Sequence, residues 1–259
     1  MNRNHRKQNK RKMRAVSSPK SPEIKYRRQL DFLVRKLKQE INVSLIPALK
    51  AFESEYVTDA YAKSLEEVFD RMRRSFDNVG KQAAIVSNSF VNESNQVNKR
   101  RFYKAMEEAV GVDLQSVVKS ENLEDILVAT TRENVSLIKS IPDEYFKNIE
   151  SIVFTNTTQG RTASSMIKQI QKQGKVTTRR AKLIARDQSS KLNSALNQQR
   201  QKNLGVEEYI WRTAGDSRVR EDHNSKNGKI FRWDSPPADT GHPGQDIQCR
   251  CVAQPIINI

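Results

Sequence analysis

The spacing of apolar side chains changes at Gly205 in this sequence of 259 residues. Between residue 22 and that glycine, apolar residues recur at steps of three and four, which places them on one face of successive helices. Residues 206–214 instead alternate and are rich in β-forming side chains, as is typical of a strand. The pattern predicts an α+β protein. A mainly α-helical N-terminal region is followed by a small C-terminal domain with a helix plus an antiparallel β-sheet.

Proline and glycine residues predict where the helices begin and end. Pro47 and Pro142 suit the first turn of a new helix, whereas Gly111 and Gly174 are expected to follow helix ends. A last, long helix is predicted from about residue 177 to about residue 201.

Three strands are expected after this helix. Residues 206–214 predict the first, residues 229–233 the second and residues 247–257 the third. Asn227 and Gly228 form a dipeptide that favours a tight turn between the first two.

The chain is therefore divided into three parts. Residues 1–22 are expected to form a basic disordered arm, because like charges repel and little in the segment is apolar. Residues 23–174 are expected to be a helical region, and residues 175–259 a C-terminal domain.

The formal net charge of +16 favours an anionic partner, which could be nucleic acid, an acidic protein surface or an anionic membrane surface. No apolar run approaches the roughly 20 residues that span a bilayer, so we expect no membrane insertion. The basic N-terminus is not followed by an apolar segment and does not resemble a secretory signal.

Two sets of basic residues are candidates for contact with nucleic acid or an acidic surface. One lies in the arm and the other follows one face of the last long helix, together with Asn193 and Asn197. The alternative for both is a solvated surface without a partner. The two basic sets are Arg3, Arg6, Lys7, Lys10, Arg11, Lys12 and Arg14, and Arg179, Lys182, Arg186 and Arg200.

Both cysteines of the chain lie near its C-terminal end, at Cys249 and Cys251. On a strand they would project to the same side, because residues two apart share a face. With His223 and His242 they could supply the four ligands of one structural zinc ion. The alternative is that the thiols are small buried hydrophobic groups and the histidines are hydrogen-bonded loop residues. A disulfide between them is disfavoured, because extended backbone strains it.

A metal-dependent nuclease is a further alternative. Asp222, His223 and Asn224 precede a predicted turn, as in sites where a histidine activates water beside a divalent metal. The additional ligands that such a site needs are not evident downstream. No Gly-rich phosphate loop or order of Ser, His and Asp stands out either, so we expect no enzymatic activity.

The segment from Ala181 to Pro255 resembles the Mu F-like minor head proteins of the phage head-morphogenesis family. The matching motifs, in order, are "RRAKLIARDQ", "GVEEYIWRTAGDSRVREDHNSKNGKIF" and "HPGQDIQCRCVAQPI". The family usually has Ile-Ala-Arg-Thr-Glu on the long helix, whereas this chain has Asp187 and Gln188 after Arg186. The acid has moved by one residue, which on a helix places it about a third of a turn away. Any ion pair of the family's Glu is therefore in doubt.

The resemblance implies a low-copy minor capsid protein inside the virion, near the portal. Such a protein would be in the host cytoplasm during assembly. Its expected partners are the portal protein, an inner capsid or scaffold surface, and packaged DNA bound without sequence specificity, with no membrane. It would act in head assembly and in DNA packaging or ejection. Residues 23–174 would then be the portal- or capsid-docking region.

Some members of the family carry toxin or enzyme domains after the Cys-Arg-Cys motif. Because few residues follow Cys251, we expect no such domain here. The alternative to a virion component is a free basic nucleic-acid-binding protein of the infected cell.

Overall fold

The computed structural model describes residues 10–51, 59–115, 118 and 120–258. The chain folds into two compact units. The sheet unit comprises Met1–Glu23, Phe90–Thr130 and Arg186–Ile259, and the helical unit comprises Ile24–Ser89 and Thr131–Ala185. Three long helices, α4 (Val79–Val110), α5 (Glu124–Thr158) and α6 (Ala163–Asn203), contribute residues to both units. The α+β class predicted from the sequence is confirmed.

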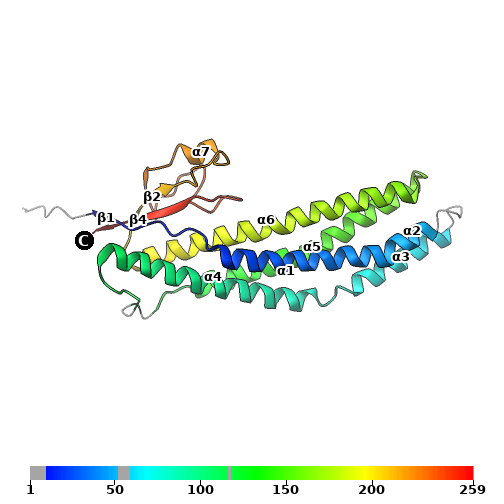
Figure 1. The fold of residues 1–259 in the computed structure, drawn as a ribbon, viewed down its shortest axis with the longest axis horizontal. Helices are drawn as coiled ribbons and strands as arrows, with labels where there is room; N and C mark the ends of the chain where they lie inside the picture. Colours follow the sequence, from blue (N-terminus) through cyan, green and yellow to red (C-terminus); the bar gives the residue numbers. More distant parts are fainter. Residues whose placement is uncertain (1–9, 52–58, 116–117, 119, 259) are drawn as a thin grey trace, which may run out of the picture. The chain divides into compact units, whose positions relative to one another are not determined.

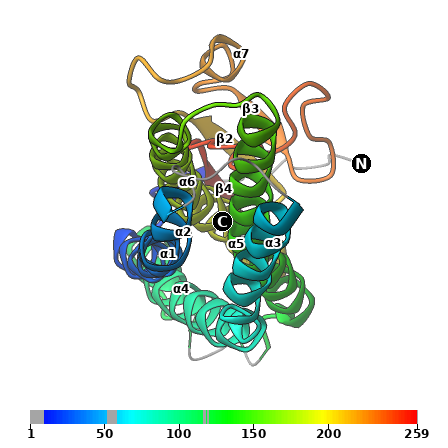
Figure 2. The same ribbon diagram turned by 90° about the vertical axis from the view of Figure 1, so that its right-hand side faces the viewer.

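The helical unit begins at Ile24, within α1 (Lys20–Glu40). This helix continues through a π-helical turn (Ile41–Leu45) into α2 (Ile46–Ala51). The next helix is α3 (Asp59–Arg74), and parts of α4, α5 and α6 complete the unit. Figure 2 shows these helices nearly end on, arranged around a common interior. The side chains in that interior are those of the predicted apolar stripes, including Leu37, Phe69, Met72, Tyr145 and Ile149.

The π-helical turn explains how the chain passes Pro47 without ending a helix. Proline cannot donate a backbone hydrogen bond and crowds the preceding turn. The wider turn just before it is closed by the N–H of Ile46, which donates to the carbonyl of Ile41. Pro47 therefore lies in the first turn of α2, as predicted, but α2 is continuous with the preceding helical turn.

Two predicted helix breaks are wrong. Pro142 lies inside α5, and Gly174 lies inside α6. On either side of Pro142, Ile138, Ile141 and Tyr145 are buried, so packing outweighs the helix-breaking tendency of proline. The predicted boundary at residue 174 thus lies in the interior of one continuous helix of 41 residues.

Gly174 occupies a place where a neighbouring side chain comes close. A Cβ atom on this residue would lie 3.0 Å from Cε of Lys38 and 3.4 Å from the hydroxyl of Tyr145. Close approach therefore explains this glycine better than a helix end does. The helix ends predicted before Gly111 and Gly205 are confirmed, and both glycines have a positive φ.

The sheet unit contains a four-stranded antiparallel sheet with the order β1-β4-β2-β3. Figure 1 labels β1, β2 and β4 of this sheet. Its strands are β1 (Lys10–Lys12), β2 (Glu208–Arg212), β3 (Ile230–Arg232) and β4 (Val252–Asn258). The inner strand β2 pairs Tyr209 with Phe231 of β3 and with Pro255 of β4. Gly228, with φ of 81°, donates its N–H to the carbonyl of Trp211 and closes the predicted turn before β3.

Residues 10–22 are not the disordered arm that the sequence predicts. Met13 and Val16 are buried against Phe102 and Met106, which anchors the segment to α4. The side-chain amides of Asn193 and Asn197 both donate to the carbonyl oxygen of Val16, at 3.1 and 2.8 Å. Apolar burial and these hydrogen bonds outweigh the repulsion between basic residues.

Across the described residues, no helix has both the length and the apolar character that crossing a bilayer requires.

Candidate functional site

A compact cluster of His223, Cys249 and Cys251 lies in the sheet unit. His223 belongs to the short helix α7 (Glu221–Asn224), and both cysteines precede β4. Nδ1 of His223 lies 3.4 Å from Sγ of Cys249 and 3.5 Å from Sγ of Cys251. All three side chains are buried, and neither cysteine forms a disulfide. The cluster therefore brings two thiols to the same nitrogen of one imidazole ring.

Asp246 fixes the orientation of the His223 ring. Its Oδ2 lies 2.9 Å from Nε2 of His223, and the ring edge packs against Trp211 at 5.5 Å between centroids. A carboxylate is an acceptor, so the proton of a neutral imidazole belongs on Nε2 here. Nδ1 is then unprotonated, and its lone pair faces the two sulfur atoms.

The backbone around Cys249 forms a turn rather than the strand expected from the sequence. Sγ of Cys249 accepts N–H bonds from Gly244 at 3.3 Å and from Cys251 at 3.4 Å. Gln248 has φ of +59°, and its N–H donates to Oδ1 of Asp187. The prediction that the strand begins at residue 247 is wrong, because these side-chain acceptors replace the ladder bonds of a sheet.

Gly244 approaches α6 so closely that a side chain would not fit. A Cβ atom there would lie 2.7 Å from Cβ of Ser194, and φ is +88°. The same glycine donates its N–H to Cys249, so its close fit against α6 also sets the position of that sulfur atom.

The two cysteines affect each other's ionisation in opposite directions. The pKa of Cys249 is lowered, first because its sulfur accepts a hydrogen bond from Cys251, and further by two backbone N–H groups and His223, although burial opposes this. The pKa of Cys251 is raised, because it donates to Cys249 and is itself buried. Cys249 is therefore the thiol that ionises first.

His242 does not belong to this cluster. Its Nδ1 lies 2.9 Å from the hydroxyl of Tyr209, and its ring packs against Trp233 at 4.8 Å between centroids. Burial, followed by the charge of Lys202, lowers the pKa of His242, so the ring is neutral at neutral pH. The structure thus brings together three of the four residues predicted as zinc ligands and uses His242 in the aromatic core.

A cavity of about 160 Å³ borders the cluster. Arg218 and Arg250 donate to the carboxylate of Asp216 at 2.9 and 2.6 Å, which holds both guanidinium groups in place. These bonds, from Arg250 first and then Arg218, keep the pKa of Asp216 well below its usual range. The cavity is lined by the three cluster residues together with Arg186, Arg218, Arg220 and Arg250, among others.

Residues 147–254 match the family model described as Phage Mu protein F like protein. This range begins in α5, contains α6 and ends in β4, so it holds the whole cluster. Residues 147–254 form a Mu F-like region. The resemblance inferred from the sequence motifs is thereby confirmed for this part of the chain.

An uncharacterized protein of Haemophilus influenzae (strain ATCC 51907 / DSM 11121 / KW20 / Rd) is 35% identical over 255 residues. The alignment covers 96% of this chain and 56% of that relative, so the chain spans a little over half of the relative's length. No solved structure matches the chain.

Within the Mu F-like region, the basic residues predicted on α6 have different environments. Arg179, Lys182 and Arg186 are exposed. Arg200 is buried, and its guanidinium group binds the carboxylate of Glu121 at 2.9 Å. Arg200 is therefore not available to a nucleic acid, and this part of the predicted basic face is wrong.

Asn193 and Asn197 are buried as well, so the predicted polar face of α6 faces protein toward its C-terminal end. Arg200 further donates to the side-chain oxygens of Asn95 and Asn98. Spacing along α6 could not reveal this, because Glu121 lies 79 positions away in the sequence.

The basic residues of the N-terminal segment lie outside the Mu F-like region. Lys10 pairs with Glu208 at 2.9 Å and Arg14 with Glu108 at 3.1 Å. Arg11 donates to the carbonyl of Ala109, and Lys12 is exposed. Arg3, Arg6 and Lys7 lie outside the described residues.

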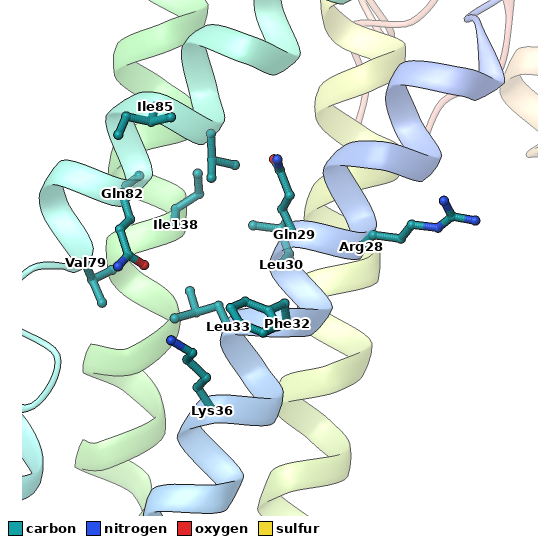
Figure 3. A pocket seen from close by; sticks show the side chains of 12 residues that line it. Arg28, Gln29, Leu30, Phe32, Leu33, Lys36, Val79, Gln82, Ile85 and Ile138 are labelled. Carbon is teal, nitrogen blue, oxygen red and sulfur yellow. The ribbon is translucent and has the colours of Figure 1, made fainter.

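The helical unit carries an apolar groove of about 330 Å³, whose lining residues lie outside the Mu F-like region. Figure 3 shows Phe32 and Leu33 of α1 facing Ile85 of α4 and Ile138 of α5 across it. Phe32 is 52% exposed and Ile85 is 70% exposed, which is unusual for large apolar side chains that lie close together. Arg28 and Lys36 line its edge, and Nζ of Lys36 lies 4.9 Å from the Phe32 ring centroid.

Proposed function

We propose that this chain is a minor head protein of a bacteriophage, present at low copy number inside the capsid near the portal. The observation that carries the proposal is the match of residues 147–254 to the Mu F-like family. In this proposal the chain enters the head during assembly in the host cytoplasm and acts in assembly and in DNA packaging or ejection. Its role is structural rather than enzymatic.

The apolar groove of the helical unit is the proposed docking surface for the portal protein. Its floor is apolar, and its edge carries the cations Arg28 and Lys36. This chemistry fits a partner helix that presents apolar side chains flanked by carboxylates. Exposed apolar groups at the centre of such a groove would supply most of the binding energy, and the cations would select an acidic partner.

Non-specific contact with packaged DNA is proposed for the exposed residues Arg179, Lys182 and Arg186. Binding to phosphates releases counterions, so the affinity should fall steeply with salt. Replacing all three residues with Gln should reduce the slope of log affinity against log salt by up to about 0.9 per lost phosphate contact. An unchanged slope would exclude these residues as DNA contacts.

The docking proposal is tested by co-expressing the chain with the portal protein of the same phage and measuring their co-purification. Phe32→Asp places a charge in the apolar groove and should abolish the complex. The chain should stay folded, because Phe32 is half exposed. The matched control is Val43→Asp, because Val43 is 67% exposed and does not line the groove. Docking through this groove would be contradicted if both variants lost the complex to the same extent, or if neither variant lost it.

A further inference from the structure

The donor atoms of His223, Cys249 and Cys251 already have nearly the spacing of a metal coordination sphere. Tetrahedral zinc binds nitrogen at about 2.0–2.1 Å and sulfur at about 2.3 Å, so bound nitrogen and sulfur atoms lie about 3.6 Å apart. The two distances from Nδ1 of His223 to the sulfur atoms are 3.4 and 3.5 Å. All three donor atoms lie within 4.8 Å of one another. Each nitrogen-to-sulfur distance is therefore within a few tenths of an ångström of its value in a zinc complex.

The surroundings of the donors also have the features of a metal site. Metal-binding histidines generally donate their other ring N–H to a carboxylate or carbonyl group, which fixes the tautomer. Asp246 provides that acceptor for Nε2 of His223 at 2.9 Å. The N–H groups of Gly244 and Cys251 point at the sulfur of Cys249, where they stabilise a thiolate.

We propose that His223, Cys249 and Cys251 bind one zinc ion through Nδ1 and the two sulfur atoms. Two soft thiolates and an imidazole favour zinc over magnesium or calcium, which prefer oxygen ligands. The charges of two thiolates neutralise the ion, so the complex can be buried at low cost. This inference does not depend on the proposed head function, since it concerns the isolated chain.

The fourth ligand is a solvent molecule in the bordering cavity. His242 is held by Tyr209 and Trp233, and no other histidine, cysteine or carboxylate of the described residues completes this group. The cavity of about 160 Å³ is large enough to hold several water molecules. The arginine residues that line it would also attract a small anion to the same position.

A second arrangement of donors competes with this one. Asp222, His223 and Asp246 also lie close together, and Asp222 is exposed. A magnesium or manganese ion there would bind Nε2 of His223 and would displace its hydrogen bond to Asp246. That site would need neither cysteine, so the two arrangements respond differently to cysteine substitution.

The test is metal analysis of the full chain, purified without a histidine tag. We expect one zinc ion per chain, and substitution with cobalt should give sulfur-to-cobalt charge-transfer bands in the near ultraviolet. Cys249→Ser and Cys251→Ser should each lose the metal. Asp246→Ala should weaken zinc affinity about 10- to 100-fold, because it removes only the partner of the ligand. His242→Asn is the matched control and should keep the zinc ion.

Circular dichroism shows whether each variant is folded. If the cysteine variants unfold, the cobalt spectrum of the wild-type chain shows whether the sulfur atoms bind the metal. Folded wild-type protein that takes up no zinc and shows no charge-transfer bands would overturn the proposal. Metal retained by both cysteine variants, or lost with His242→Asn in a folded protein, would overturn it as well.

Discussion

At the scale of single residues, Arg200 is the clearest example of a side chain whose role depends on the folded chain. Its side chain is completely buried, and the carboxylate of Glu121 is mostly buried beside it. Burial alone would raise the pKa of Glu121. Hydrogen bonds and charge from Arg200 outweigh that effect, and the pKa lies below its ordinary value of 4.5. The ion pair therefore stabilises the folded sheet unit.

Replacing Arg200 with Met should lower the free energy of unfolding by about 3 kcal/mol, because Glu121 loses its nearest counter-charge in a mostly buried setting and keeps only Lys99 at 3.7 Å. Urea unfolding measures this value. Arg179→Met is the matched control, since Arg179 is exposed on the same helix, and it should change stability by less than about 0.5 kcal/mol. Equal effects of the two substitutions would contradict the buried pair.

The cost of Arg200→Met should also depend on pH. The folded pKa of Glu121 is lower than its ordinary value, so the contribution is complete above about pH 4.5 and is lost as the pH falls through the folded value. We therefore expect the difference in stability between the wild-type chain and the variant to shrink below pH 4.5. A difference that grows with acidification would have the wrong sign for this pair.

The candidate site was only partly predictable from the sequence. The thiols of Cys249 and Cys251 were expected to lie together, and His223 joins them as expected. His242 does not, because Tyr209 and Trp233 hold it in the aromatic core. Asp246 was missed because a hydrogen bond to a histidine 23 positions away depends on the path of the loop.

At the scale of elements, local signals predicted the helix ends that depend on local geometry. Gly111 and Gly205 both have positive φ, and each follows a helix. Pro142 and Gly174 carry the same kind of signal but lie within helices. There the buried neighbours decide the structure, and they come from distant parts of the sequence.

The continuity of α6 can be tested at Gly174. Gly174→Pro should destabilise the helical unit by about 3 kcal/mol or more, because proline removes a hydrogen bond and clashes with the preceding turn. Gly174→Ala should be nearly neutral, since a gain in helix propensity of about 1 kcal/mol is offset by displacing the flexible end of Lys38. Urea unfolding followed by circular dichroism compares the two. A cost below about 1 kcal/mol for proline would indicate a break at this position.

At the scale of the whole molecule, sequence and structure divide the chain differently. The sequence suggested a division between residues 174 and 175, at the helix end predicted before a new long helix. In the structure, the sheet unit instead consists of three separate segments of the chain and the helical unit of two. The reason is that α4, α5 and α6 each contribute residues to both units. Composition along the chain could not reveal this, since each long helix has apolar residues over its full length. The net charge of +16 is consistent with the proposed position beside packaged DNA, because a positive chain attracts the phosphate backbone.

The protein composition of purified, nuclease-treated heads from a phage that encodes this chain tests the proposed role most directly. Quantitative mass spectrometry, calibrated against the portal subunit, gives the number of copies per particle. We expect a few copies in both procapsids and DNA-filled heads. Absence of the chain from both kinds of particle, while the infected cells contain it, would contradict a role as a minor head protein.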